Sequence, residues 1–538
     1  MSYAETTEHA PDSQPRAAGL RGHAVRSGAL GEHAPDDAQA AAPYAEAVQR
    51  LADSHPLQVM VPGHGGTGVG GAHLAATFGE RTVQLDVPLM LEGIDLGDHS
   101  PLNASLALAA EAWGARRVWW LTNGASQGNR TAAFAVRGLG ERVMMQRSSH
   151  SSFTDGVLLA GLIPAFVSPN VDHVHGIAHG LTPEMLDAAL REETAAGRPV
   201  QSVYVVSPSY FGSTADVAGL VEVAHNHAAA LIVDNAWAAH YGFHPELPES
   251  PARLGADLVI SSTHKLAGSF TQSAMLMLGE GPFADRLEPL VKRAYTMTSS
   301  TSASSVLMAS LDLARRALVQ GTDKIEAAIR HSDELRERLR ADPRFSVISD
   351  EFDQFPDIVS SDPLHVPIDV SRLGQSGHWV RDRLIAEHGV FFEMSTATSI
   401  VAILGALALP DLDRLMAALT AVADEADALR AAGESADHSG FPQLPEPGTL
   451  RMLPRSAFFA DSVVVTAHQA IGQVSADTLA AYPPGIPNLV PGEEITEETV
   501  TFLQAVAASP TGYVRGAVDP LVATFRVVRD PISAAQAG

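Results

Sequence analysis

Cysteine is absent from this 538-residue chain, and lysine is rare. The absence of cysteine excludes disulfide bonds, thiolate catalysis and cysteine-ligated zinc, and it is compatible with a reducing compartment. No stretch comes near the roughly 18 consecutive apolar residues that a membrane span needs. The N-terminus also lacks the apolar segment of a secretory signal peptide. We therefore expect a cytoplasmic protein, and we predict no metal site.

Basic residues are also fewer than acidic ones, with 36 Lys and Arg against 62 Asp and Glu. The net charge is −26, and charged residues make up only 18% of the chain. This balance argues against nucleic acid or an anionic membrane as a partner. With 46% hydrophobic residues, the chain is long enough for two or three domains with their own cores. Residues 1–40, a mixture of Ala, Gly, Pro, Asp and His, are predicted to be a disordered leader.

Short apolar runs alternate with Ala- and Leu-rich helical patterns through the first half of the chain. Helices are predicted at 127–140, 182–195 and 216–229, among others. The apolar runs are 116-RRVWWLTNG, 142-RVMMQRSSH, 162-LIPAFVSP, 201-QSVYVVSPSYFG, 230-ALIVDNAW, 257-DLVISSTHK and 274-AMLMLG. Continuous apolar runs are typical of strands that helices cover on both faces, which predicts an α/β fold with a mostly parallel sheet. Ligands of such sheets bind beyond the carboxyl ends of the strands.

The rest of the chain predicts smaller domains. A large domain is expected over 41–330, followed by a small α+β domain over 331–435. The small domain's pattern is a helix at 323–341, a strand-like run at 363–371, a helix at 376–388 and a second strand-like run at 389–394. A Gly-, Pro- and Ser-rich linker at 431–450 leads into a C-terminal domain over 436–538.

Unusual residues gather at three predicted strand ends. The stretch 121-LTNGASQGNR places small residues between a strand and a helix, which makes an anion site from backbone N–H groups or simply an ordinary turn. Asp234 ends the run ALIVD, and two readings fit it: a helix cap, or a buried anion that keeps a heterocyclic nitrogen protonated. Lys265 ends the next run, and it is either a surface residue or a reactive amine. Together, an anion cradle, a buried Asp and a Lys one unit later are what pyridoxal phosphate (PLP) chemistry needs. His150, at another strand end, can stack on the ring.

Several separated motifs resemble the bacterial Orn/Lys/Arg decarboxylases, which are PLP enzymes of fold type I. The motifs are 95-DLGDHSP, 121-LTNGASQGN, 147-RSSHSS, 207-SPSYFG, 231-LIVDNAWAAHYG, 261-SSTHKLAGSFTQ, 298-TSSTS and 482-YPPGIPNLVPGEEIT. The resemblance implies a large domain with a mostly parallel seven-stranded sheet, smaller α+β C-terminal domains, and a homodimer or higher homo-oligomer with shared active sites. It implies that PLP-dependent decarboxylation of lysine, ornithine or arginine yields the amine and CO₂.

The resemblance also implies a role for each matching residue. Lys265 would form the Schiff base with PLP, Asp234 would bind the pyridine nitrogen, and His150 would stack on the ring. Lys265 or His264 would deliver the proton to Cα. Glu493 would lie near the cationic end of the substrate, although a solvated carboxylate fits its sequence context equally well. The other cofactor-contacting positions would be Gly124, Ala125, Ser126, Trp237, Ser262, His264 and Ser302, with Ser302 reaching the neighbouring subunit's cofactor.

The chain departs from the family pattern at several positions around the site. Ala125 replaces a Ser or Thr of the cradle, 147-RSSHSS lacks the family's Asn and Lys, and Ala303 replaces a Pro. Two alternatives therefore stay open. One is another PLP reaction of the same fold type, an aminotransferase or a lyase. The other is a non-catalytic regulatory paralogue.

Overall fold

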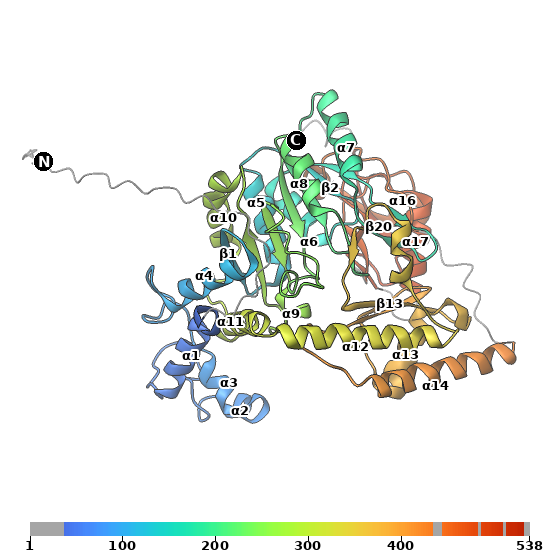
Figure 1. The fold of residues 1–538 in the computed structure, drawn as a ribbon. Coiled ribbons are helices and arrows are strands. Elements are labelled where there is room, and N and C mark those ends of the chain that lie inside the picture. Colours follow the sequence, from blue (N-terminus) through green and yellow to red (C-terminus); the bar gives the residue numbers. More distant parts are fainter. Residues whose placement is uncertain (1–36, 434–443, 483–485, 509–512, 532–538) are drawn as a thin grey trace, which may run out of the picture.

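The computed structural model describes residues 37–433, 444–482, 486–508 and 513–531 (Figure 1). The predicted leader lies outside the described residues as far as position 36. Residues Asp37–Ala40 already form a short 3-10 helix, η1, whose Gln39 is buried and receives a hydrogen bond from Arg315. Residues 434–443, half of the predicted linker, and residues 483–485 of the YPPGIP motif also lie outside the described part.

A seven-stranded sheet forms the centre of the fold (Figure 1). Its strand order is β1-β10-β9-β8-β6-β2-β3, and β10 alone in this sheet runs antiparallel to its neighbours. Each strand falls within one of the seven apolar runs, so the prediction of a mostly parallel sheet is confirmed. The strands are β1 (Arg117–Leu121), β2 (Arg142–Gln146), β3 (Ile163–Val167), β6 (Ser202–Val206), β8 (Ala230–Asp234), β9 (Leu258–Ser261) and β10 (Ala274–Leu278).

Each face of this sheet has its own hydrophobic core, because successive side chains of a strand point to opposite faces. On β6, Tyr204 belongs to one core, whereas Val203 and Val205 belong to the other. The Tyr204 face is covered by α5 (Gly124–Val136), α6 (Ser151–Ala160) and α10 (Ala284–Thr298). The opposite face is covered by α1 (Pro43–Asp53), α4 (Pro101–Trp113), α7 (Pro183–Ala195), α8 (Val217–Asn226) and α11 (Ser305–Val319).

Helix α5 differs from its predicted range of 127–140. It begins at Gly124, whose φ of 71° lets the chain turn directly from β1 into the helix, and it ends before Gly138. The other two predicted helices of the large domain agree with α7 and α8 to within three residues at each end.

The small domain is a four-stranded antiparallel sheet of order β11-β13-β15-β14 with helices against it. Residues 389–394 were predicted as a strand, but only Met394 belongs to one, because the chain leaves α13 through Gly389 at a φ of 60°. The strand that pairs along β13 is β15, which the sequence reading missed. The elements are α12 (Thr322–Ala341), β11 (Ser346–Val347), β13 (His365–Asp369), α13 (Gly377–His388), β14 (Met394–Ser395), β15 (Ser399–Ile403) and α14 (Leu412–Ala431).

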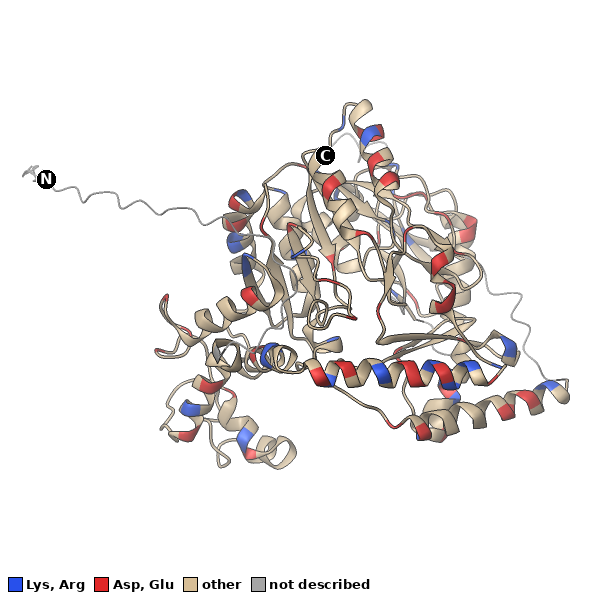
Figure 2. Cartoon of the chain, viewed as in Figure 1, with Lys and Arg blue, Asp and Glu red and all other residues tan. Residues whose placement is uncertain are grey.

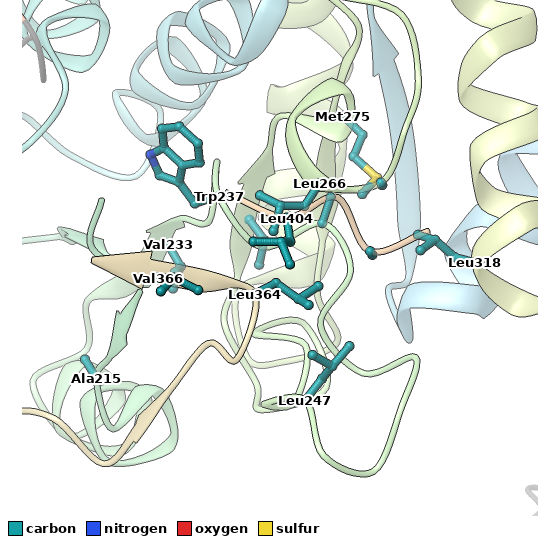
Figure 3. Packing of buried hydrophobic residues seen from close by; sticks show 14 of the residues in the cluster. Ala215, Val233, Trp237, Leu247, Leu266, Met275, Leu318, Leu364, Val366 and Leu404 are labelled. Atoms are coloured by element: carbon teal, nitrogen blue, oxygen red, sulfur yellow. The ribbon is translucent and has the colours of Figure 1, made fainter. Parts of the chain in front are cut away.

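One hydrophobic core runs from the large domain into the small one. Figure 3 shows Leu364 and Leu404 of the small domain beside Leu266 of the large domain, with Trp237 close by. The backbone N–H of Ala406 also donates to the carbonyl of Leu266. The small domain is thereby packed against the segment that carries Lys265.

The C-terminal domain has a separate core. Strand β16 pairs with β20, and β17 lies between β18 and β19. The elements are α15 (Pro454–Phe459), β16 (Ser462–Thr466), α16 (Ala467–Ala470), β17 (Leu479–Tyr482), β18 (Ile486–Leu489), α17 (Glu497–Ala508), β19 (Tyr513–Arg515) and β20 (Thr524–Val528).

The helices α2 (Ala72–Phe78) and α3 (Glu80–Leu85) project from the body of the molecule (Figure 1). Figure 2 shows acidic and basic residues interleaved along α12, where Arg330 pairs with Glu326 and Arg338 with Glu334. Among the described residues, no helix is both long and apolar enough to cross a membrane.

Candidate active site

A cavity of about 220 Å³ opens at the carboxyl ends of the parallel strands, where this fold class binds ligands. It is lined by Gly124, Ala125, Ser126, Asn129, Ser148, His150, Ser152, Val206, Tyr210, Asp234, Ala236, Trp237, Ser262, His264 and Lys265. All but two of the predicted site residues are thus brought together. A second hollow, of about 230 Å³, lies between α8 and the 241–254 loop, and neither lysine nor histidine lines it.

Lys265 lies on the one-turn helix α9 (Thr263–Leu266) that follows β9, rather than at the strand end itself. Its Nζ is 3.4 Å from the ring centre of Trp237 and 5.9 Å from that of Tyr210. Burial lowers the pKa of Lys265 from 10.5 to about 8, although the charges of Asp234 and Glu393 oppose the shift. Within the described part of the chain, no hydrogen bond or ion pair engages this amine. It is therefore available as a nucleophile near neutral pH.

Asp234 ends β8 and is almost completely buried. Its Oδ2 accepts hydrogen bonds from the Tyr204 hydroxyl at 2.5 Å and from Asn129 Nδ2 at 3.0 Å. Its Oδ1 accepts one from the N–H of Ala236 at 3.1 Å. No cationic side chain of the described residues lies within ion-pair distance, so the carboxylate is a buried anion held by neutral donors.

His150 is the N-cap of α6, where its Nδ1 accepts a hydrogen bond from the N–H of Ser152. The Ser152 hydroxyl is 2.8 Å from the same nitrogen and in turn accepts from Asn129 at 2.9 Å. Burial lowers the pKa of His150, so the imidazole is neutral at neutral pH. Because Nδ1 is an acceptor, these partners place the proton on Nε2.

His264 has the opposite tautomer. Its Nδ1 is 2.8 Å from the carbonyl oxygen of Ser273, which can only accept, so Nδ1 carries the proton and Nε2 does not. Burial lowers the pKa of His264 as well. The two histidines therefore offer the cavity chemically different nitrogens: Nε2 is a donor on His150 and an acceptor on His264.

The segment 124–126 forms the first turn of α5, and the first N–H groups of a helix have no partner within it. These groups and the positive end of the helix dipole favour an anion at this point. A Cβ on Gly128, in the next turn, would lie 2.8 Å from Ile260 and 2.9 Å from Leu121, so this helix packs closely on the sheet. Close packing fixes the position of the turn relative to Lys265.

Ser302 and Glu493 are the two predicted site residues that do not line the cavity. Ser302 is exposed in the loop between α10 and α11. Glu493 is 1% exposed, and its Oε2 accepts from Arg147 at 3.0 Å and from the N–H of Val490 at 2.9 Å. Burial raises the pKa of Glu493, while Arg147 opposes the rise. Glu493 is therefore not a solvated carboxylate but half of a buried ion pair.

The sequence reading missed the residues that hold the predicted ones. Tyr204 and Asp234 lie on the same face of neighbouring strands, because Val206 pairs with Asp234 and Tyr204 is two residues before it. Asn129 projects from α5 toward this face. The signal in the sequence was the Asn one turn beyond the NGAS stretch and a tyrosine within an otherwise aliphatic strand. Glu393 was also missed; its charge opposes the lowering of the pKa of both Lys265 and His264 by burial.

Comparison with known proteins identifies the family. The Orn/Lys/Arg decarboxylase major domain matches residues 42–355, more than half of the chain. The chain belongs to the Orn/Lys/Arg decarboxylase family. It is an amino-acid decarboxylase, and its fold is PLP fold type I. The C-terminal domain of the same family matches residues 446–512.

Relatives of this decarboxylase cover most of its length. The arginine decarboxylase of Bacillus subtilis (strain 168) is 32% identical over 492 residues, which span 90% of this chain and 97% of that protein. The lysine decarboxylase of Hafnia alvei is 25% identical and spans 86% of this chain and 74% of that protein. Among solved structures, the lysine decarboxylase LdcF of Francisella novicida has a TM-score of 0.76 at 21% identity, covering 90% of this chain and 80% of that one.

Proposed function

We propose that this decarboxylase binds PLP at Lys265 and removes the α-carboxylate of a basic amino acid, with arginine as the first candidate. The observation that carries the proposal is an unpaired amine with a pKa near 8 in the same cavity as a buried carboxylate that has no cationic partner. The choice of arginine is supported by four relatives that are 30–32% identical and are named arginine decarboxylases.

The side chains in the cavity fit PLP. The Lys265 amine suits an aldehyde, the Asp234 carboxylate suits a pyridinium nitrogen, and the first turn of α5 suits a phosphate. Trp237 Nε1 is buried and has no hydrogen-bond partner among the described residues, so a polar group of a ligand would satisfy it. Ala125 leaves the cradle without one hydroxyl but keeps its backbone N–H.

When bound, PLP supplies a ring that accepts the electrons released as the carboxylate leaves. The protein's own residues prepare that step. Asp234 would hold a proton on the ring nitrogen, and His150, whose Nε2 carries the proton, lines the same cavity. Lys265, or His264 through its unprotonated Nε2, carries the proton that Cα receives.

Glu493 as the partner of the substrate's cationic end stays a prediction. The supporting argument is that a basic side chain needs an acid at its far end. Because Glu493 is already paired with Arg147, it would have to exchange that cation for the substrate's. The cytoplasmic location likewise stays a prediction.

A homodimer with shared active sites is part of the proposal. Its support is the exposure of large apolar side chains on the projecting N-terminal segment: Leu57 is 91% exposed, and Val59 and Val69 are each 92% exposed. Phe270, five residues after Lys265, is exposed too, as is the loop that carries Ser302. Sedimentation velocity is expected to give a dimer. A fully active monomer at assay concentration would contradict this proposal.

The test of the reaction is a product screen on the PLP-loaded protein with arginine, lysine and ornithine. We expect CO₂ and the matching amine in equal amounts, fastest with arginine. Formation of a keto acid without CO₂ would indicate an aminotransferase instead. A protein that shows no PLP absorbance band after loading would favour the non-catalytic alternative.

A further inference from the structure

Tyr204 and Asn129 are buried residues that both donate hydrogen bonds to Asp234, and we call this pair the support of Asp234. Asn129 lies within the motif 121-LTNGASQGN, whereas Tyr204 lies outside the family motifs. Tyr204 is completely buried on β6, and its ring lies 3.6 Å from that of Phe153, stacked at 18°. Phe153 belongs to α6, the helix that His150 caps. The Phe153 ring therefore packs on the face of the Tyr204 ring, and the Tyr204 hydroxyl donates to Asp234 Oδ2 at 2.5 Å.

The hydrogen bonds around Asp234 leave one position open. A carboxylate has about four lone-pair sites, two on each oxygen. Tyr204 and Asn129 fill both sites of Oδ2, and the N–H of Ala236 fills one site of Oδ1. The remaining site is on Oδ1, and Asp234 lines the cavity. The support therefore decides which oxygen is available to a ligand.

The hydrogen bond between Tyr204 and Asp234 also fixes the position of the phenol proton. Burial, and then the charge of Asp234, raise the pKa of Tyr204 well above 10, so the phenol keeps its proton and donates it to the carboxylate. Donors to an anion stabilise its charged form over its protonated form.

We propose that Tyr204, with Asn129, is the positioning residue that occupies Oδ2 of Asp234 and presents Oδ1 to the ring nitrogen of PLP, which favours the proton on the ring. This inference rests on the proposed PLP binding. Asn129 also donates to Ser152, whose hydroxyl contacts His150 Nδ1. One amide thus links the Asp234 carboxylate, through Ser152, to the histidine predicted to stack on the ring.

The test is Tyr204→Phe, which removes one hydroxyl and keeps the ring that stacks on Phe153. Tyr241→Phe is the matched control, because Tyr241 is an equally buried tyrosine whose hydroxyl contacts Thr214 at 2.9 Å, outside the cavity. Both proteins are loaded with PLP labelled with ¹⁵N in the pyridine ring. The ¹⁵N chemical shift, the affinity for PLP and the rate of CO₂ release are then measured.

In Tyr204→Phe we expect the ¹⁵N shift to move toward that of neutral pyridine, and PLP affinity and turnover each to fall by about tenfold or more. Tyr241→Phe should match the wild type in all three. A folded Tyr204→Phe protein with wild-type values would overturn the inference. If that variant does not fold, Asn129→Ala removes the second Oδ2 donor and must move the ¹⁵N shift in the same direction. Failure of the wild-type protein to bind PLP would instead refute the proposed function.

Discussion

Two buried carboxylates, Asp234 and Glu493, differ in their hydrogen-bond donors. Asp234 lies in the cavity, and Glu493 lies where the C-terminal domain contacts the large domain. Asp234 is held by a phenol, an amide and a backbone N–H, all of them neutral. Glu493 is paired with the Arg147 guanidinium, which also donates to the carbonyls of Pro487 and Asn488. An anion with neutral donors keeps its charge available for a ligand, whereas an anion with a cationic partner is already compensated.

A third buried carboxylate, Asp362, belongs with Glu493. It lies 3.0 Å from His240 of the large domain and 2.8 Å from His365 of the small domain. Although burial alone would raise the pKa of Asp362, the charges of the two histidines hold it well below its usual range. Glu493 and Asp362 thus join domains as compensated carboxylates, whereas Asp234 lies in the cavity without a cationic partner among the described residues.

Neutral donors alone do not mark a functional acid, because within the described part of the chain the buried Asp357 accepts only from Asn170 and the N–H of Gly180 and joins the large and small domains. The contrast between Asp234 and Glu493 can be tested by substitution.

The largest effect is expected from Lys265→Ala, which removes the amine of the cavity. Decarboxylation should fall by a factor of about 10³ or more, because no other group can take the place of a covalent nucleophile. The measurement is CO₂ release, together with the absorbance of the PLP-treated protein. Lys292→Ala is the matched control, since Lys292 is an exposed lysine on α10. Substantial turnover by Lys265→Ala would refute the assignment of this residue.

The next largest effect is expected from Asp234→Asn, which keeps the side-chain shape and removes the charge. Turnover should fall by about 10²-fold, the scale of losing one preorganised electrostatic contact, with little loss of thermal stability. The control is Asp155→Asn, a partly exposed acid of α6 that pairs with Arg130 outside the cavity. If Asp234→Asn unfolded the protein and left the turnover of the folded fraction unchanged, the distinction between the two kinds of carboxylate would fail.

Glu493→Gln should show the reverse of Asp234→Asn: a loss of stability with little loss of turnover. It leaves Arg147 buried without a charged partner, which should cost about 3 kcal/mol in the free energy of unfolding. Glu494→Gln is the neighbouring control; its partner Arg451 is well exposed, so its loss should cost less than about 1 kcal/mol. Denaturant unfolding measures both. A KM for arginine that rises more than tenfold at unchanged stability would instead establish Glu493 as the substrate's acid.

Particular residues explain how much of this the sequence could predict. The central strands were predictable because each is a continuous apolar run. The placement of Asp234, Lys265 and His150 around one cavity was predictable because each lies at or just after the end of such a run. Tyr204 was not, because a tyrosine in a strand fits strand propensity alone; its role depends on the register that sets it beside Asp234. Arg147 and Glu493 are 346 residues apart, and only the packing of two domains brings them together.

The smallest effect concerns the pH at which Lys265 becomes reactive. Only the neutral amine attacks an aldehyde, so the rate of PLP attachment to the apo-protein should rise about tenfold per pH unit and level off above about pH 8. Glu393 opposes the lowering of the Lys265 pKa, so Glu393→Gln should move the midpoint to lower pH. Stopped-flow absorbance at a series of pH values measures both curves. A midpoint near 10.5 would mean that the cavity does not tune this amine. A shift in Glu393→Gln without one in Glu494→Gln would show that an acid of the small domain acts on the cavity through its charge, although its side chain is exposed.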